Sequence, residues 1–438
     1  MKKVYLSIIG FSIICRCSVF AQTKPDSTFT RKPVTNISVN QDSGAYKSRK
    51  LKLDEVNLVS SYYFQYGDHS AITGGIGTQS VTDVANGLDL KFLWYGNNNR
   101  KNTLSAGLGI DYHTAASSAY LTNTGLGKQD GTRIYPSLDW TVENERSGTT
   151  FGIGAYYSGE YNYVSRGADV HFSIKTADKN GELGVKLQAY LDQVTLIYPA
   201  EFVSTINPAP TGSTYITTAS GNKVLSSGGN TGATSKPPLT SSPRNTYAAS
   251  LSWSQVINSR LQVSFLTDLV TQNGYLGLPF HRVYFSNAKD TIEKLPSTRF
   301  KLPIGLRANY FFGDYIILRS YYRYYTDNWG INSNTANLEV VLKATPFFSV
   351  SPFYRYYNQS ASKYFQPYEV HKVTDQYYTS NYEFAKFESS FFGVGLRVAP
   401  PAGVFGWRNL HDLEIRYGHY AQTTDLVSDV ISFNLGFK

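Results

Sequence analysis

The chain has 438 residues, of which 15% are aromatic and only 17% are charged, and its formal net charge at pH 7 is +9. This length suits about two or three ordinary domains or one large barrel. Beyond residue 21 no apolar run approaches the ~18 residues that a membrane helix needs, which excludes a helical membrane protein. A basic chain suggests nucleic-acid binding, but the export signal and strand pattern described below argue against that class.

Residues 1–21 are typical of a secretory signal peptide. Lys2 and Lys3 form a basic start, residues 4–14 are mostly apolar, and Ala21 provides a small residue before cleavage. Both cysteines of the chain precede this point, so the mature protein would contain no disulfide. Its formal charge would fall by three, from +9 to +6, with the loss of Lys2, Lys3 and Arg16. Residues 22–50 are polar and predict a flexible periplasmic lead-in.

The rest of the chain, 51–438, is predicted to be a transmembrane, antiparallel, up-and-down β-barrel. Residues 299–310 (RFKLPIGLRANY) show why, since every second position from Phe300 is apolar while Arg299, Lys301 and Arg307 lie between them. Strand side chains alternate between two faces, so one face suits lipid and the other a polar lumen. The pattern recurs about sixteen times, with roughly 14 to 18 strands compatible with it. The predicted strands are 53–66, 87–96, 101–113, 133–145, 148–159, 167–177, 182–197, 245–257, 260–272, 299–311, 314–326, 332–343, 347–357, 388–398, 408–420 and 428–438.

The connections between these strands alternate between short polar turns and longer loops. The longer loops are predicted at 67–86, 114–132, 198–244, 273–298 and 358–387. Outer-membrane barrels have short periplasmic turns and long external loops, so these loops should face outward. Loop 198–244 is low in complexity and predicts a long mobile external loop rather than a domain. The connections at 159–166 and 327–331 are short for external loops, so strands could be merged or split there.

Aromatic residues predict the same orientation. Tyrosines gather late in the upward strands, as at 62–66, 156–161, 321–325 and 354–357, and should form a girdle at the outer rim. Trp94, Trp253 and Trp407 fall near the inner rim. The last strand ends in Phe437, which resembles the signal that the barrel-assembly machinery reads, although Lys438 follows it.

The inward positions predict a lumen with two walls of opposite charge. The pore-lining acidic wall would comprise Asp89, Asp111, Asp139, Glu143, Glu160, Asp169 and Asp192. The pore-lining basic wall would comprise Arg299, Lys301, Arg307, Arg319, Arg323, Lys343, Arg355, Arg397 and Arg416. Two interpretations remain open. Either the walls set up a transverse field across a water-filled pore, or the same groups pair across the barrel and only satisfy a polar interior.

Catalytic and metal-binding patterns are weak, and no catalytic residue, metal or cofactor is predicted. None of the seven histidines has a spacing that selects a hydrolase triad or a zinc site, although His171 faces the lumen between Asp169 and Lys175. The glycine-rich stretch 73–78 (TGGIGT) lacks the Lys and following helix of a phosphate-binding loop, which favours a turn-rich loop. The loop segments 278–285 and 364–371 could bind a ligand or partner, or fold inward and set the pore size.

Several stretches together resemble one family rather than barrels in general. They include LKLDEVNLVSSYY, RIYPSLDWTVENE, LPFHRVYF, RFKLPIGLRANYFFGD, YYRYYTDNWGI, SVSPFYRYY and LEIRYGHY. The mature chain resembles, nearly end to end, an uncharacterised family of bacterial outer-membrane proteins, domain of unknown function 3570. This resemblance implies a β-barrel in a Gram-negative outer membrane and brings no assigned activity.

The expected function is a passive pore or substrate-selective channel for a small polar or charged solute that is not identified. A closed barrel that uses its external loops for binding or assembly is the alternative, and an outer-membrane hydrolase is a weaker one. The expected partners are outer-membrane lipid and the barrel-assembly machinery, with no nucleic acid.

Overall fold

The computed structural model describes residues 50–96, 100–114, 130–197, 214–217, 223–226 and 240–438. The predicted signal peptide (1–21), nearly all of the predicted lead-in (22–50) and most of loop 198–244 lie outside the described residues. None of the helices in the described ranges is long and apolar enough to cross a membrane.

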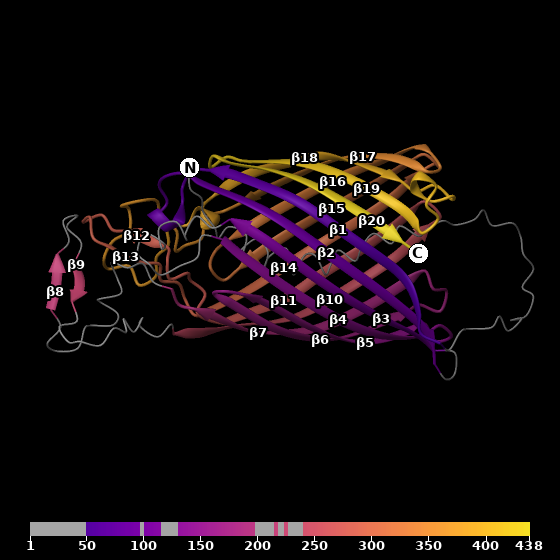
Figure 1. Cartoon of the computed structure of the whole chain (residues 1–438), viewed down its shortest axis with the longest axis horizontal. Helices are drawn as coiled ribbons and strands as arrows, with labels where there is room; N and C mark the ends of the chain where they lie inside the picture. Colours follow the sequence, from indigo (N-terminus) through magenta and orange to yellow (C-terminus); the bar gives the residue numbers. More distant parts are fainter. Residues whose placement is uncertain (1–49, 97–99, 115–129, 198–213, 218–222, 227–239) are drawn as a thin grey trace, which may run out of the picture.

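The architecture is a closed barrel of sixteen antiparallel strands (Figure 1), which confirms the predicted fold class. β1 pairs with β2 on one side and closes the barrel against β20 on the other, from Val56 opposite Phe437 to Gly67 opposite Leu426. The barrel strands are β1 (Lys52–Gly67), β2 (Gln79–Tyr95), β3 (Lys101–Thr114), β4 (Asp130–Asn144), β5 (Thr149–Glu160), β6 (Tyr163–Lys175), β7 (Gly181–Thr195), β10 (Ser241–Asn258), β11 (Leu261–Gly274), β14 (Thr298–Phe312), β15 (Ile316–Asp327), β16 (Asn332–Thr345), β17 (Phe348–Gln359), β18 (Phe387–Val398), β19 (Leu410–Gln422) and β20 (Leu426–Phe437).

Short elements lie in the connections. Within the described residues they are two hairpins, β8 (Thr214–Thr217) with β9 (Lys223–Ser226) and β12 (Arg282–Tyr284) with β13 (Asp290–Ile292), and the 3-10 turns η1 (Ala71–Thr73), η3 (Tyr382–Phe384) and η4 (Val404–Gly406). β12 and β13 lie beyond the end of the barrel opposite the C-terminus (Figure 1). The longer connections lie at this end, away from the start of β1 and the end of β20. Outer-membrane barrels have long external loops and short periplasmic turns, so we take this end as the external one.

The alternation along each strand sorts side chains between the two faces of the wall. On β14, Phe300 and Leu306 are 44% and 51% exposed, whereas Arg299 and Lys301 are each 7% exposed. The same outward face carries Leu108, Leu138, Phe151, Leu187, Leu251, Leu269, Leu338 and Phe392, all exposed. An apolar surface this extensive is not stable in water. A closed barrel has no unpaired edge and can lie in hydrocarbon, so the protein is an outer-membrane β-barrel with lipid on this face.

The strand ends differ from the predicted ones at the external loops. β2 begins at Gln79 rather than residue 87, and β10 begins at Ser241 rather than residue 245. Both strands extend further toward the external end than predicted, because the ends of their partners β1 and β7 lie beside them. Backbone pairing continues as long as the two strands remain in register. The two short external connections, 161–162 and 328–331, are tight turns between separate strands, so no strands are merged there.

The tyrosine girdle is divided between the two faces of the wall. Tyr62 and Tyr66 are 51% and 48% exposed on the lipid side of β1. Tyr63, between them, points inward, and its hydroxyl donates to Gln65 at 2.7 Å. Consecutive tyrosines cannot all face lipid, because the period of a strand is two. The prediction that 62–66 gathers wholly into a girdle is therefore wrong for Tyr63.

Inward-facing glycines make room for large side chains on the neighbouring strand. A Cβ atom at Gly109 on β3 would stand 1.9 Å from Cε2 of Tyr135 on β4. Tyr135 cannot easily move, because its hydroxyl donates to Asp111 at 2.5 Å. Gly87, on β2, is paired directly with Gly109. No described atom lies within 4 Å of the position that a Cβ atom on Gly87 would occupy.

We predict that Gly109→Val lowers the free energy of unfolding by about 1–3 kcal/mol, the usual cost of overpacking, whereas Gly87→Val leaves it nearly unchanged. The two positions face each other, so strand propensity and membrane depth are matched. Urea unfolding of the refolded barrel, followed by tryptophan fluorescence, measures the difference. Equal effects of the two substitutions would show that the contact with Tyr135 does not constrain the wall.

Candidate functional site

The structure places every predicted wall residue on the inward face of its strand. The acidic positions are Asp89 on β2, Asp111 on β3, Asp139 and Glu143 on β4, Glu160 on β5, Asp169 on β6 and Asp192 on β7. The basic positions are Arg299, Lys301 and Arg307 on β14, Arg319 and Arg323 on β15, Lys343 on β16, Arg355 on β17, Arg397 on β18 and Arg416 on β19. In the closed strand order these two sets occupy different halves of the barrel.

On the acidic half, carboxylates pair with cations of nearby strands. Nη2 of Arg133 lies 2.8 Å from Oδ2 of Asp111 on the adjacent strand. Nζ of Lys175 lies 2.6 Å from Oε1 of Glu143, two strands away. These pairs hold the side chains against the wall and set the direction in which each charge points.

The basic half follows the same rule. Arg397 pairs with Asp412 on the adjacent strand at 2.5 Å. Glu339 lies between two guanidinium groups, at 3.6 Å from Arg319 and 3.3 Å from Arg416. Each of these ion pairs joins two groups of the same half of the barrel. Such half-exposed pairs add little stability, but they determine where each charge points.

Several guanidinium groups of the basic half also lie over aromatic rings. The guanidinium carbon of Arg416 is 5.1 Å from the centre of the Phe353 ring, and that of Arg355 is 5.7 Å from Phe391. These contacts are cation–π interactions. They were not predicted, because β17 and β18 supply aromatic partners whose approach depends on strand register rather than on sequence spacing.

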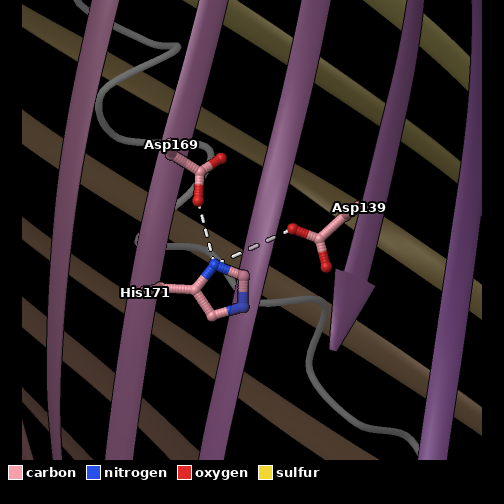
Figure 2. Close-up of side chains that lie close together, drawn as sticks. All are labelled: Asp139, Asp169 and His171. Atoms are coloured by element: carbon pink, nitrogen blue, oxygen red, sulfur yellow. Dashed lines mark hydrogen bonds and ion pairs between the residues drawn. The ribbon is translucent and has the colours of Figure 1, made fainter. Parts of the chain in front are cut away.

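One cluster in the acidic half was not predicted from the sequence (Figure 2). Nδ1 of His171 lies 2.9 Å from Oδ1 of Asp169 and 3.8 Å from Oδ2 of Asp139. Asp139 comes from β4, whereas Asp169 and His171 come from β6, so the three side chains meet across β5.

Glycines on β5 allow this meeting. A Cβ at Gly152 would stand 2.1 Å from Nε2 of His171, and a Cβ at Gly154 would stand 2.2 Å from Oδ2 of Asp169. Any other residue at these positions would push the imidazole and the carboxylate away from β5. The alternating glycines of the sequence FGIGAY are the signal from which this cluster could have been anticipated.

Three external connections fold together over the outer mouth, and we call residues 68–78, 275–297 and 360–386 the cap. Nη1 of Arg282 donates to the carbonyl oxygen of Ile72 at 2.5 Å and joins the second segment to the first. The His69 ring stacks on Tyr382 with centroids 3.8 Å apart, which joins the first segment to the third. The predicted turn-rich stretch 73–78 lies in the first segment, where Gly74, Gly75 and Gly77 have positive φ.

A buried carboxylate holds the second and third segments of the cap together. Glu293 is 4% exposed, and its Oε2 accepts a hydrogen bond of 2.5 Å from the hydroxyl of Thr379 and lies 3.4 Å from Nδ1 of His281. Its Oε1 accepts from the backbone N–H of Leu278 at 2.9 Å. Burial strengthens these bonds and makes their loss costly, so the cap is a folded unit rather than a set of loose loops.

The cap also contacts the upper wall of the lumen. Gln359 at the end of β17 donates to the carbonyl oxygen of Ala385 at 2.6 Å. The guanidinium of Arg299 lies 4.5 Å from the ring of Trp329, which is 1% exposed, and 5.6 Å from that of Phe384. The segments 278–285 and 364–371 therefore belong to a structure that covers the external entrance.

Comparisons with known proteins give one family and several solved structures. The family model described as "Protein of unknown function (DUF3570)" matches residues 96–426. No curated protein matches the sequence. Similar solved structures include OccK9 (OpdG) of Pseudomonas aeruginosa, with a TM-score of 0.41 and 10% identity over 87% of this chain and 97% of that one. A BenF-like porin from Pseudomonas fluorescens Pf-5 has a TM-score of 0.39 and 7% identity over 90% and 100%. P. aeruginosa OpdK with vanillate has a TM-score of 0.40 and 9% identity over 90% and 100%.

We predict that one turn of the cap loosens in acid. His371 holds the Asp375 carboxylate at 3.1 Å, and the backbone N–H of Lys372 donates to it, so the pKa of Asp375 is lowered. Because this pKa is lowered, the ionised carboxylate stabilises the turn fully above the ordinary carboxyl pKa of about 3.9. This stabilisation is lost as the pH falls through the lowered pKa of Asp375.

Hydrogen exchange of residues 372–379, corrected for intrinsic rates, checks this. Protection should be constant from pH 7 to about 5 and decrease below the ordinary carboxyl pKa of about 3.9. Asp375→Asn should show reduced protection already at pH 7. If that variant and the parent protein are equally protected at pH 7, the carboxylate does not hold the turn.

Proposed function

Since this chain belongs to the DUF3570 family, whose description assigns no function, we propose its function from its own lumen: a passive outer-membrane channel for small polar or charged solutes. The observation that carries this proposal is the division of inward charge into an acidic and a basic half. Barrels of about 16–18 strands are wide enough to enclose water, and the barrel has sixteen. Opposed charged walls create a field across such a lumen that favours charged and dipolar solutes over apolar ones.

The basic half would contact anionic groups of the solute. Arg307 lies 5.7 Å from the ring of Tyr321, and Arg355 and Arg416 have similar aromatic neighbours. An arginine that packs its flat face on a ring keeps its N–H edge for a carboxylate or phosphate. In this proposal, the summed positive charge of this half of the lumen attracts anionic groups. The proposed role is non-enzymatic, since binding and release complete the process.

A closed barrel with a surface function is the second candidate, and the cap favours it. The buried bonds of Glu293 and the stacking of His69 on Tyr382 make the cap a stable cover for the outer mouth. If the cap seals the barrel, the exposed surface of the cap would act in binding or assembly.

We predict that replacing Arg307, Arg319 and Arg323 together by Gln shifts ion selectivity several-fold toward cations. Removing three positive charges from one wall makes the electrostatic potential of the lumen more negative, which disfavours anions and favours cations. The reversal potential of the refolded mature protein in a planar bilayer, under a salt gradient, measures the shift.

The matched control removes three charges outside the barrel. Arg146, Lys179 and Arg260 lie exposed in turns at the periplasmic end, and their replacement by Gln should leave the reversal potential nearly unchanged. If the lumen variant and this control give the same reversal potential, the transverse-field proposal is wrong.

We predict that loosening the cap increases conductance without changing selectivity. Arg282→Ala combined with Thr379→Val removes the bond to Ile72 and one bond to Glu293. Lys372→Ala, on the exposed surface of the cap, is the control. A silent parent protein with a conducting loosened variant would support the sealed-barrel candidate. Equal conductance of all three proteins would show that the cap does not restrict the entrance.

A further inference from the structure

We propose that Asp139, Asp169 and His171 form a binding site for a divalent transition-metal cation, such as Zn²⁺, on the wall of the lumen. The site is separate from the basic half of the lumen, and its existence does not depend on whether the barrel conducts. Three kinds of observation carry it: the spacing of the ligand atoms, the orientation of Asp169, and the accessibility of the other two side chains.

The spacing of the ligand atoms suits one ion. One imidazole nitrogen and one oxygen from each carboxylate all lie within 4.8 Å of one another. Zinc binds imidazole nitrogen and carboxylate oxygen at about 2.0–2.2 Å, which places neighbouring ligands of one tetrahedral ion roughly 3–3.5 Å apart. The separations of 2.9 Å and 3.8 Å between His171 and the two aspartates bracket that value. Small side-chain rotations would therefore complete the coordination.

Asp169 is already oriented as a ligand. Its Oδ2 accepts a hydrogen bond from the hydroxyl of Tyr156 and lies 3.2 Å from Nζ of Lys186. Its Oδ1 faces His171 instead (Figure 2). Metal-binding carboxylates are commonly held in this way by hydrogen bonds to the oxygen that does not bind the ion. The side chain of Asp169 has 0% exposure, so this orientation is maintained by packing as well.

The other two side chains open the cluster to the lumen. The side chains of Asp139 and His171 are 30% and 22% exposed. Within the described ranges, Asp139 forms no ion pair shorter than its 3.8 Å contact with His171, which leaves its carboxylate ready to accept a cation. An ion could enter from the lumen and keep water in its remaining positions, as sites with three protein ligands do.

The ligand set indicates the class of cation. An imidazole with two carboxylates suits zinc and other first-row transition metals, whereas Mg²⁺ and Ca²⁺ prefer oxygen ligands alone. The two aspartates carry two negative charges and Lys186 one positive charge, so the cluster favours a dication over an anion. Without a metal, His171 would simply donate to Asp169, and the test must separate this structural role from binding.

The test is isothermal titration of Zn²⁺ and Ni²⁺, in separate experiments, into the full mature barrel refolded in detergent. We expect one site, with affinity reduced at least tenfold by His171→Ala and by Asp139→Asn. Lys186→Gln should increase affinity, because it removes a cation that competes for Asp169. His113→Ala is the matched control, since His113 is another inward histidine paired with a carboxylate, Glu160, at 3.0 Å, and its replacement should leave affinity unchanged.

Three outcomes would overturn the proposal. They are no saturable binding, equal loss of affinity in the His171 and His113 variants, and unchanged affinity in Asp139→Asn. Asp139 is half-exposed, so Asp139→Asn tests the site even if His171→Ala fails to refold. A barrel that conducts but binds no Zn²⁺ would contradict only this site, and a silent barrel that binds Zn²⁺ through His171 would contradict only the proposed channel.

Discussion

The pairing of β1 with β20 is the interaction on which the rest of this structure depends. In hydrocarbon an unpaired backbone N–H or C=O costs several kcal/mol, so a sheet can span the membrane only when its first and last strands bond to each other. The register from Val56–Phe437 to Gly67–Leu426 provides that closure over nearly the full height of the wall. Closure turns the inward face of every strand into one enclosed surface, and the predicted wall residues lie there.

Crowding between neighbouring strands then shapes that enclosed surface. Gly109 accommodates Tyr135, and Gly152 and Gly154 accommodate His171 and Asp169. Charged groups also pair with neighbours of the same half of the barrel, as Arg133 does with Asp111 and Arg416 with Glu339.

The cap is stabilised differently from the wall, because it lies outside the membrane and folds around a small buried core of its own. Val283 and Thr379 are each 0% exposed, and the buried carboxylate of Glu293 joins segments that are far apart in the sequence. In the proposed channel the two parts would have separate roles, since the cap would limit access to the entrance and the charged walls would favour certain solutes in the lumen.

The sequence by itself determined the closed-barrel class, the direction of each strand and the face on which each wall residue lies. These properties are local, because the alternation of period two is visible within a single strand such as 299–310. Only the tertiary structure decided which residues meet: His171 with Asp139 across β5, Arg416 with Glu339, and Glu293 with Thr379 in the cap. Partners depend on register between strands and on contacts between distant loops, and those are properties of the closed sheet as a whole. The assignment of Tyr63 to the outer girdle with Tyr62 overlooked the local alternation, because neighbouring strand residues point to opposite faces.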